Sequence, residues 1–303
     1  MLLALAGIPL YAVIAVALGV FASDPLATEA AARMRPTYMY LYMLLTGLYI
    51  GALAAGSVVQ QLVFVALTGA LAVALWQKAR DEVPYLLDPA ASPPARVSAA
   101  DGLMAAMLFF VTQVLALMIL KGKGLADLQD IALAFGIAGA LTYAMTRLVY
   151  WRSKTAGVPR ISNGSPAWRL ALSGAALAAV FGIGYTMLLH RHGVAPPASP
   201  LLDGQWSWLW LGALAVLAAP LFEEFIFRGL IQGGLRRSLP AWQAIVISAA
   251  IFAIVHPPAS MLPVFVLGLC AGRAYERSGA LLAPMLVHGM YNGAVLGCQF
   301  ALF

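Results

Sequence analysis

The chain has 303 residues, of which 62% are hydrophobic and only 10% are charged, and its formal net charge is +6. Its mean hydropathy is +0.88. Soluble domains carry roughly a quarter charged residues, so this composition excludes an ordinary soluble protein and indicates a chain embedded in a lipid bilayer. The basic excess matches the preference of cytoplasmic loops for Lys and Arg. Basic residues do not alternate with aromatic ones in any patch, so nucleic acid is not expected as a partner.

Apolar segments long enough to cross a bilayer recur along the whole chain. A transmembrane helix needs about 20 such residues. In chain order the predicted spans are residues 2–22, 38–56, 57–76, 101–120, 129–150, 168–189, 206–235, 241–256, 262–276 and 279–302. Residues 38–76 are compatible either with a tight hairpin or with one long broken helix. The sequence therefore predicts an all-α, polytopic membrane helix bundle with about ten transmembrane spans.

The Lys and Arg residues indicate how this bundle is oriented. If the loop over residues 151–168 is cytoplasmic, 14 of the 18 basic residues fall on the inner side and three on the outer side. The remaining one, Arg228, lies inside a predicted span. This asymmetry follows the positive-inside rule, and it supports both the orientation and the number of crossings.

One predicted span, residues 206–235, contains three ionisable residues within the sequence PLFEEFIFRG. A charged side chain at the centre of a bilayer costs about 2.5–3.5 kcal/mol on insertion scales, and such residues face protein or water. Glu224 and Arg228 are four residues apart, with the acid first, which favours an ion pair on a helix. Glu223 points about 100° away around the helix axis and has no such partner. A structural ion network and a functional site are both compatible with this helix alone.

Two later spans add polar residues at a similar depth. Phe252 and His256 are four residues apart, and so are His288 and Asn292, so each pair shares one helix face. At 1.5 Å per residue from the cytoplasmic helix ends, Glu223, His256 and Asn292 all lie about 20 Å deep. His288 lies about 14 Å deep.

A carboxylate beside an imidazole can hold and deprotonate a water molecule, and a second imidazole with an amide can donate hydrogen bonds to an oxyanion. The sequence has no G-x-S-x-G motif and no H-E-x-x-H motif. The set therefore indicates hydrolysis of an acyl or peptide bond by an activated water, without a covalent intermediate.

At these residues the sequence resembles the CAAX protease and bacteriocin-processing family of glutamate-type intramembrane proteases, which is related to the type II CAAX prenyl endopeptidases. The resemblance is carried by E-E-x-x-x-R (Glu223, Glu224, Arg228), F-x-x-x-H (Phe252, His256) and H-x-x-x-N (His288, Asn292), in this order. It covers roughly residues 206–300. It implies a catalytic membrane domain over residues 166–303, preceded by a transmembrane region of unknown role over residues 1–165.

The resemblance also implies a role for each motif residue. Glu223 would be the catalytic carboxylate that activates water, and His256 would help to hold that water. His288 and Asn292 would form the oxyanion pocket. Glu224 and Arg228 would support the site by pairing, and Phe252 would pack or face the substrate.

No cofactor is expected, although zinc stays open as an alternative. Glu223, His256 and His288 are possible zinc ligands in principle. Asn292 is a poor zinc ligand, and the sequence shows no carboxylate that would orient the histidines from behind.

The leading hypothesis is therefore a multi-pass intramembrane endopeptidase of a bacterial inner membrane, acting on a membrane-associated protein or peptide. Cleavage of membrane anchors, sorting signals or leader peptides is favoured over prenylated substrates. The alternative is a non-catalytic membrane scaffold or immunity protein that uses the same fold. A proton-coupled transporter ranks below both, because the inverted repeats typical of transporters are not visible.

Overall fold

The computed structural model describes residues 97, 99–121, 126–149, 159, 167–193, 206–237 and 239–302. These residues form helices and contain no strand, in agreement with the predicted all-α class. The predicted spans at 2–22, 38–56 and 57–76 lie outside the described residues, as does most of the region 1–165. The boundary at residue 165 stays a prediction.

The helices follow the predicted apolar segments closely. They are α6 (Ala99–Leu120), α7 (Leu128–Val149), α8 (Ala167–Arg191), α9 (Ser207–Gly212), η2 (Ala213–Ala218), α10 (Ala219–Glu224), η3 (Phe225–Gln232), α11 (Gly233–Leu235), α12 (Ala241–Ile254), η4 (Pro258–Ser260), α13 (Met261–Ser278) and α14 (Leu282–Leu302). The elements from α9 to α11 follow one another without a break, so the predicted span 206–235 is one helical run.

Not every helix is long enough to cross a bilayer. Within the described residues, Leu128–Arg147, Trp168–Arg191 and Ser207–Leu235 are long and apolar enough. Ala241–Ile254 is a shorter apolar helix, and Leu108–Leu120 is an apolar stretch within α6. The chain is therefore an integral membrane protein with three helices that meet both criteria in this part of the molecule. The predicted total of about ten spans is not confirmed.

Proline and glycine explain several helix ends. Pro240, in an extended conformation, precedes α12, where its missing N–H costs nothing. Helix α13 ends at Ser278, and its C-cap Gly279 has φ of +65°. The N–H of Gly279 donates to the carbonyl of Tyr275. Glycine adopts this left-handed conformation without strain. Because of this cap, α14 begins at Leu282 instead of the predicted residue 279.

The run from α9 to α11 changes its helical geometry twice. Segments η2 and η3 are π-helical, and π-helical turns are frequent at functional sites. Pro220, which follows η2, has no N–H to donate to the carbonyl of Val216 four residues earlier, and this loss disturbs a regular α-helix. This loss accounts for a disturbance in η2 only. Segment η3 begins after α10, the short segment that ends in Glu223 and Glu224.

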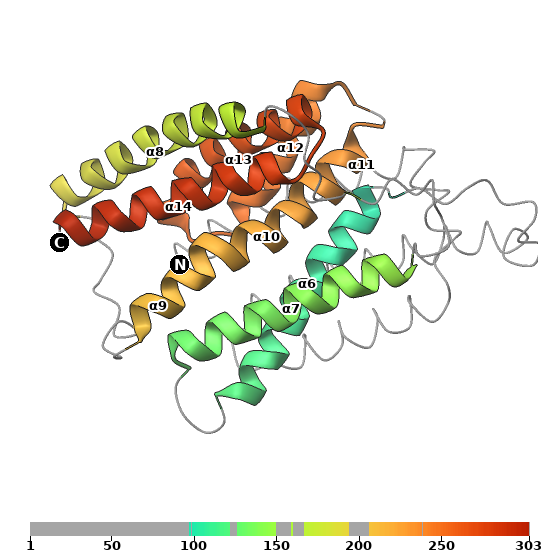
Figure 1. The fold of residues 1–303 in the computed structure, drawn as a ribbon, viewed down its shortest axis with the longest axis horizontal. Coiled ribbons are helices and arrows are strands. Elements are labelled where there is room, and N and C mark those ends of the chain that lie inside the picture. The colour runs from blue at the N-terminus through green and yellow to red at the C-terminus, as the bar shows by residue number, and fades with distance from the viewer. Residues whose placement is uncertain are drawn as a thin grey trace, which may run out of the picture.

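This run lies at the centre of the described bundle. Figure 1 shows it between the α6–α7 pair on one side and helices α8, α12, α13 and α14 on the other. Segment η3 packs against α6, α12 and α13, whereas η2 and α10 pack against α7 and α14. All eight residues of η3 are buried. Of the two acids that precede η3, Glu224 is fully buried and Glu223 is 14% exposed, so both are held largely inside protein, as the cost of charge in a membrane requires.

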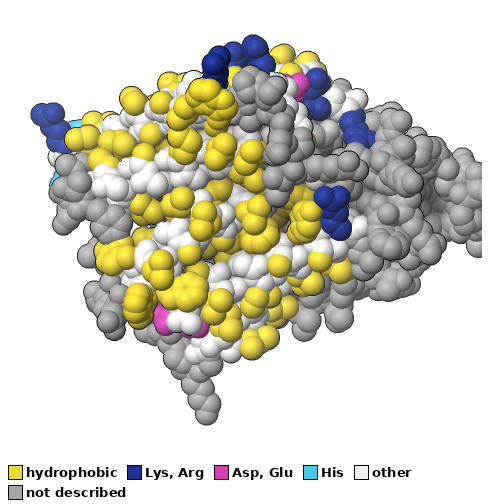
Figure 2. Space-filling view, viewed as in Figure 1, with side chains coloured by type: hydrophobic (Ala, Val, Ile, Leu, Met, Phe, Trp, Pro, Cys, Tyr) yellow, Lys and Arg dark blue, Asp and Glu magenta, His cyan; other side chains and the backbone are white. Residues whose placement is uncertain are grey.

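The outer surface matches a membrane location. Figure 2 shows one face that is largely hydrophobic, with Lys and Arg side chains at the borders of the hydrophobic area. Large apolar side chains are exposed on α8, including Leu177 at 62% and Val180 at 74%. Such side chains are solvated favourably by lipid.

Candidate active site

Glu224 is the anchored member of the acidic pair. Its side chain is fully buried, and its Oε2 lies 3.1 Å from Nε of Arg228, whose side chain is fully buried too. Its Oε1 accepts a hydrogen bond of 2.8 Å from Nδ1 of His288. The ion pair predicted from the four-residue spacing is therefore present. The carboxylate is not accessible to a substrate in this structure, because the side chain is fully buried.

Arg228 is held by more than its carboxylate. Its Nη2 donates to the carbonyl of Gly268 over 3.3 Å, and its guanidinium carbon lies 4.5 Å from the centre of the Phe252 ring. A cation over an aromatic face is attracted by the ring quadrupole. The guanidinium is therefore fixed by three helices, and its charge is opposed locally.

Phe252 connects the ion pair to both histidines. It is completely buried, and its ring meets the rings of His256 and His288 edge-on, with centroid distances of 4.7 Å and 5.6 Å. Of the two roles implied for Phe252, this geometry supports packing. Its ring sets the positions of two imidazoles relative to one guanidinium.

Glu223 has a different environment from its neighbour. Its side chain is 14% exposed, and its Oε2 lies 3.9 Å from Nε2 of His288. That oxygen accepts no hydrogen bond from any of the described residues. The carboxylate lines a pocket of about 170 Å³, which is enough space for several water molecules. Of the two acids, Glu223 is the one whose carboxylate can contact a molecule in the pocket.

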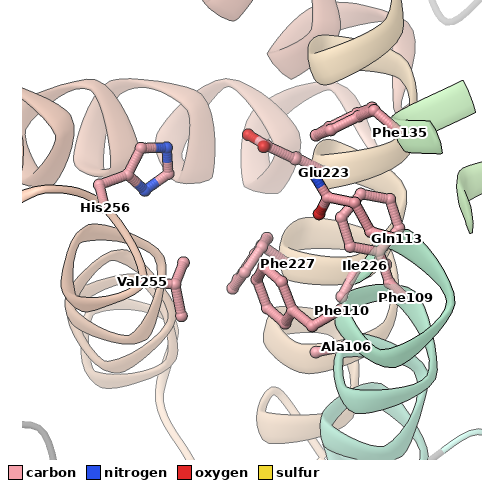
Figure 3. Close-up of a pocket in the computed structure, with 10 residues that line it drawn as sticks. All are labelled: Ala106, Phe109, Phe110, Gln113, Phe135, Glu223, Ile226, Phe227, Val255 and His256. Carbon is pink, nitrogen blue, oxygen red and sulfur yellow. The ribbon is translucent and has the colours of Figure 1, made fainter. Parts of the chain in front are cut away.

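His256 faces Glu223 from another wall of the same pocket. It follows the end of α12, and its Nδ1 lies 2.7 Å from the carbonyl oxygen of Phe252. A carbonyl can only accept a hydrogen bond, so Nδ1 carries the proton and Nε2 of a neutral ring is left with its lone pair. Figure 3 shows Glu223 and His256 on opposite sides of the pocket. The pair can therefore hold a polar molecule between a carboxylate and an imidazole.

The remaining pocket wall comes mostly from residues that the sequence analysis did not select. The pocket is lined by Ala106, Phe109, Phe110, Gln113, Phe135, Glu223, Ile226, Phe227, Val255 and His256. The first four belong to α6 and Phe135 to α7. The sequence could have indicated Gln113, because it is the one amide side chain in α6, a helix of 22 mostly apolar residues. The sequence could not have indicated the phenylalanines, since apolar residues are expected throughout a membrane helix.

His288 and Asn292 are placed near the site but are not among the residues that line this pocket. His288 lies between the two glutamates, with Nδ1 toward Glu224 and Nε2 toward Glu223. Asn292 donates from Nδ2 to the carbonyl of Ala215 over 2.6 Å, within the π-helical segment η2. The oxyanion pocket formed by His288 and Asn292 stays a prediction.

A metal site receives little support from the geometry. Among the described residues, no group of three His, Cys, Asp or Glu side chains has an arrangement that could hold a metal ion. Nδ1 of His288 donates to the carboxylate of Glu224, and Nδ1 of His256 bonds to a backbone carbonyl. The expectation that no carboxylate orients the histidines is therefore wrong for His288, and such contacts leave Nε2 of each ring free, as in zinc-binding histidines. The metal-free mechanism stays a prediction, and no proposed step uses a metal.

Residues 205–294 match the family model described as Rce1-like, type II CAAX prenyl endopeptidase Rce1-like. The matched segment contains all seven motif residues discussed above. None of the curated proteins and none of the solved structures compared with the chain matches it. The resemblance seen in three short motifs is thereby confirmed for the C-terminal third of the chain.

Proposed function

We propose that this chain, a member of the Rce1-like family through residues 205–294, is an intramembrane endopeptidase in which Glu223 activates the attacking water. The family supports a protease of the CAAX type acting on a peptide in or near the membrane. The observation that supports Glu223 as the catalytic acid is the difference between the environments of the two adjacent glutamates. Glu224 is engaged by Arg228 and His288, whereas Glu223 opens into a pocket opposite His256.

The proposed reaction begins with a water held between Glu223 and Nε2 of His256. Glu223 accepts a proton from this water as the oxygen attacks the carbonyl carbon of the scissile peptide bond. The carbonyl oxygen becomes an oxyanion, which hydrogen-bond donors near the site stabilise. His288 and Asn292 are the predicted donors. Because Nδ1 of His288 already donates to Glu224, His288 donates from Nε2 only in its doubly protonated form. The C–N bond then breaks, and Glu223 returns its proton to the leaving amine. One water and one peptide bond yield one carboxylic acid and one amine, and Glu223 ends as it began.

The surrounding residues support this role for Glu223. Burial of a second carboxylate beside it would ordinarily add repulsion between like charges. Here the positive charge of Arg228 lies 3.1 Å from Glu224 and opposes the charge of that neighbour. Glu224 also orients His288 by accepting from its Nδ1, so the Nε2 edge of the ring is turned toward Glu223. The pair and the histidine therefore act as support for one free acid.

The proposed substrate is a membrane-associated protein or peptide, and a bacterial inner membrane remains the predicted location. Cleavage of an anchor, sorting signal or leader peptide stays the favoured reaction, and no prenyl group is required by the mechanism. We also propose that the reaction requires no cofactor.

Purified protein in lipid vesicles, presented with a library of single-span peptides, tests the proposal. We expect cleavage by the wild-type protein, its loss in Glu223→Gln, and no effect of a chelator. Glu276→Gln is the matched control, because it makes the same change at a partly exposed acid that pairs with Arg236 on the surface. Cleavage retained by a folded Glu223→Gln protein would refute the proposal. Cleavage abolished by chelation and restored by zinc would refute the metal-free mechanism.

The alternative, a non-catalytic scaffold or immunity protein, makes a different prediction for the same variant. Glu223→Gln would leave its cellular phenotype unchanged, whereas disruption of the Glu224–Arg228 pair would still impair folding. Comparison of the two variants in cells therefore separates the alternatives.

A further inference from the structure

Half of the candidate pocket is built outside the segment that matches the family. Residues 205–294 account for five lining residues, including Glu223 and His256. The other five come from α6 and α7. These two helices lie outside the family match, so the pocket wall that they form can give this chain its own substrate specificity.

The wall from α6 has one polar group among aromatic ones. Ala106, Phe109, Phe110 and Gln113 are spaced three and four residues apart, so they share one helix face. The Phe109 ring meets those of Phe110 and Phe135 edge-on, at 5.5 Å and 4.8 Å. Such contacts restrain the rings. The aromatic surface is therefore a fixed feature beside the pocket.

Gln113 is the third polar residue of the pocket, after Glu223 and His256. It is half-buried and makes no hydrogen bond within the described part of the chain. Figure 3 shows it extending from α6 on the same side of the view as Glu223, across from His256. A buried polar group usually has a hydrogen-bond partner, so an amide directed into a pocket is suited to receive one from a ligand.

The chemistry of an amide points to one kind of ligand. The glutamine side chain offers one carbonyl acceptor and an NH₂ donor, and a peptide group offers one N–H donor and one carbonyl acceptor. The two are complementary, and in an apolar wall an unpaired peptide group would be costly. The phenyl rings beside Gln113 are suited to an apolar substrate side chain, and they do not neutralise a charged one.

On the premise that the chain is the protease proposed above, we infer that Gln113 is a substrate-binding residue. It hydrogen-bonds a peptide group next to the scissile bond, while an apolar side chain of the substrate packs on Phe109, Phe110 and Phe135. Glu223 and His256 carry out hydrolysis, and Gln113 positions an extended apolar peptide for it. The family segment supplies the reaction, and α6 and α7 supply part of the specificity.

Ester substitution in the substrate tests this inference directly. A single-span peptide that the wild-type protein cleaves in vesicles in a Glu223-dependent way is prepared with an ester in place of each peptide group flanking the scissile bond, which removes one N–H donor at a time. At one position we expect kcat/KM of the wild type to fall by roughly threefold to tenfold, the effect of one lost neutral hydrogen bond. Gln113→Met, which keeps the side-chain length, is expected to cleave the ester and the amide peptides equally well.

Two further variants complete the test. Gln113→Leu is a second apolar replacement with a different shape, for the case that the first does not fold. Thr112→Val is the matched control, because Thr112 is the preceding, buried residue of α6 and does not line the pocket. We expect Thr112→Val to discriminate ester from amide as the wild type does.

Each comparison is made within one protein preparation, so a change in the fraction of active protein does not affect it. Ester discrimination that persists in both Gln113 variants overturns the inference and leaves the protease proposal intact. The same holds if the wild type shows no discrimination at any flanking position. The absence of any Glu223-dependent cleavage overturns the proposed function, and the inference with it.

Discussion

Removal of Arg228 provides a quantitative test of how the site tolerates two acids. In Arg228→Met the carboxylate of Glu224 loses a counter-ion 3.1 Å away while remaining fully buried. Breaking a buried ion pair from one side costs about 3–5 kcal/mol, because the remaining charge is uncompensated. The lost hydrogen bond to Gly268 and the lost contact with the Phe252 ring act in the same direction. Nδ1 of His288 still donates to Glu224 and partly offsets the loss.

The expected result is therefore a fall of about 3–5 kcal/mol in the free energy of unfolding. Glu224→Gln is expected to be similarly unfavourable, since it leaves a buried guanidinium. The double variant Glu224→Gln/Arg228→Met removes both charges, so its loss should be smaller than the sum of the single losses by at least about 2 kcal/mol. When stability and cleavage are both measured for the double variant, recovery of folding can be distinguished from recovery of activity.

Denaturant unfolding of the purified variants in detergent micelles, followed by tryptophan fluorescence, measures these differences. Glu276→Gln is the surface control. Its pair with Arg236 is 2.9 Å long but partly exposed, so its contribution should be about 0–1 kcal/mol. If the single variants at Glu224 and Arg228 each lose less than about 1 kcal/mol and their effects add, the reasoning from a buried, coupled pair is wrong.

Three other predictions concern packing, hydrogen bonding and metal dependence. Gly139→Ala should lower the free energy of unfolding by about 1–3 kcal/mol, because the new Cβ would collide with the ring of Phe222. Gly136→Ala places its Cβ in open space, so it should be neutral or stabilise the helix by up to about 1 kcal/mol. Thermal unfolding measures both effects. Asn292→Ala should cost about 1 kcal/mol through the lost bond to the Ala215 carbonyl, and Asn292→Asp should cost more, because it sets an acceptor against an acceptor; equal stability of the two variants would contradict this geometry. Cleavage in vesicles should be unchanged by prolonged dialysis against a chelator and by later addition of zinc.

The positions of the helices could be predicted because apolar length and the residues that end helices are local properties. The expected segment 101–120 became α6 at Ala99–Leu120. Segment 241–256 became α12, which ends earlier, at Ile254, before the Pro257–Pro258 pair. Two π-helical segments were not predicted, although Pro220 marked the place where a regular helix would lose a hydrogen bond. The irregularity depends on neighbouring helices as well as on local sequence.

The site was only partly predictable for a geometric reason. Four-residue spacing correctly paired Glu224 with Arg228, because both residues lie on one helix. Residue counts from the helix ends placed Glu223, His256 and Asn292 at one level, but depth is only one of three coordinates. The rotation of the helices turned Glu223 into the pocket and the Asn292 amide to Ala215. His256 reaches the pocket from the bend that follows α12, which a continuous helix over 241–256 did not predict. The contribution of Phe109 and Gln113 required knowing that α6 packs against η3.

The two adjacent glutamates occupy different environments within the helix bundle. Consecutive residues of a helix point about 100° apart, so Glu223 and Glu224 must face different surroundings. Glu224 faces Arg228 and His288, and these contacts link α10 to η3 and α14. The Glu224–Arg228 pair lies within one helical run, and the bonds of its members to His288 and Gly268 connect this run to α14 and α13. Glu223 lines the pocket instead. His288 lies within 3.9 Å of Glu223 and 2.8 Å of Glu224, so a change at the anchored acid reaches the free one through a single imidazole ring.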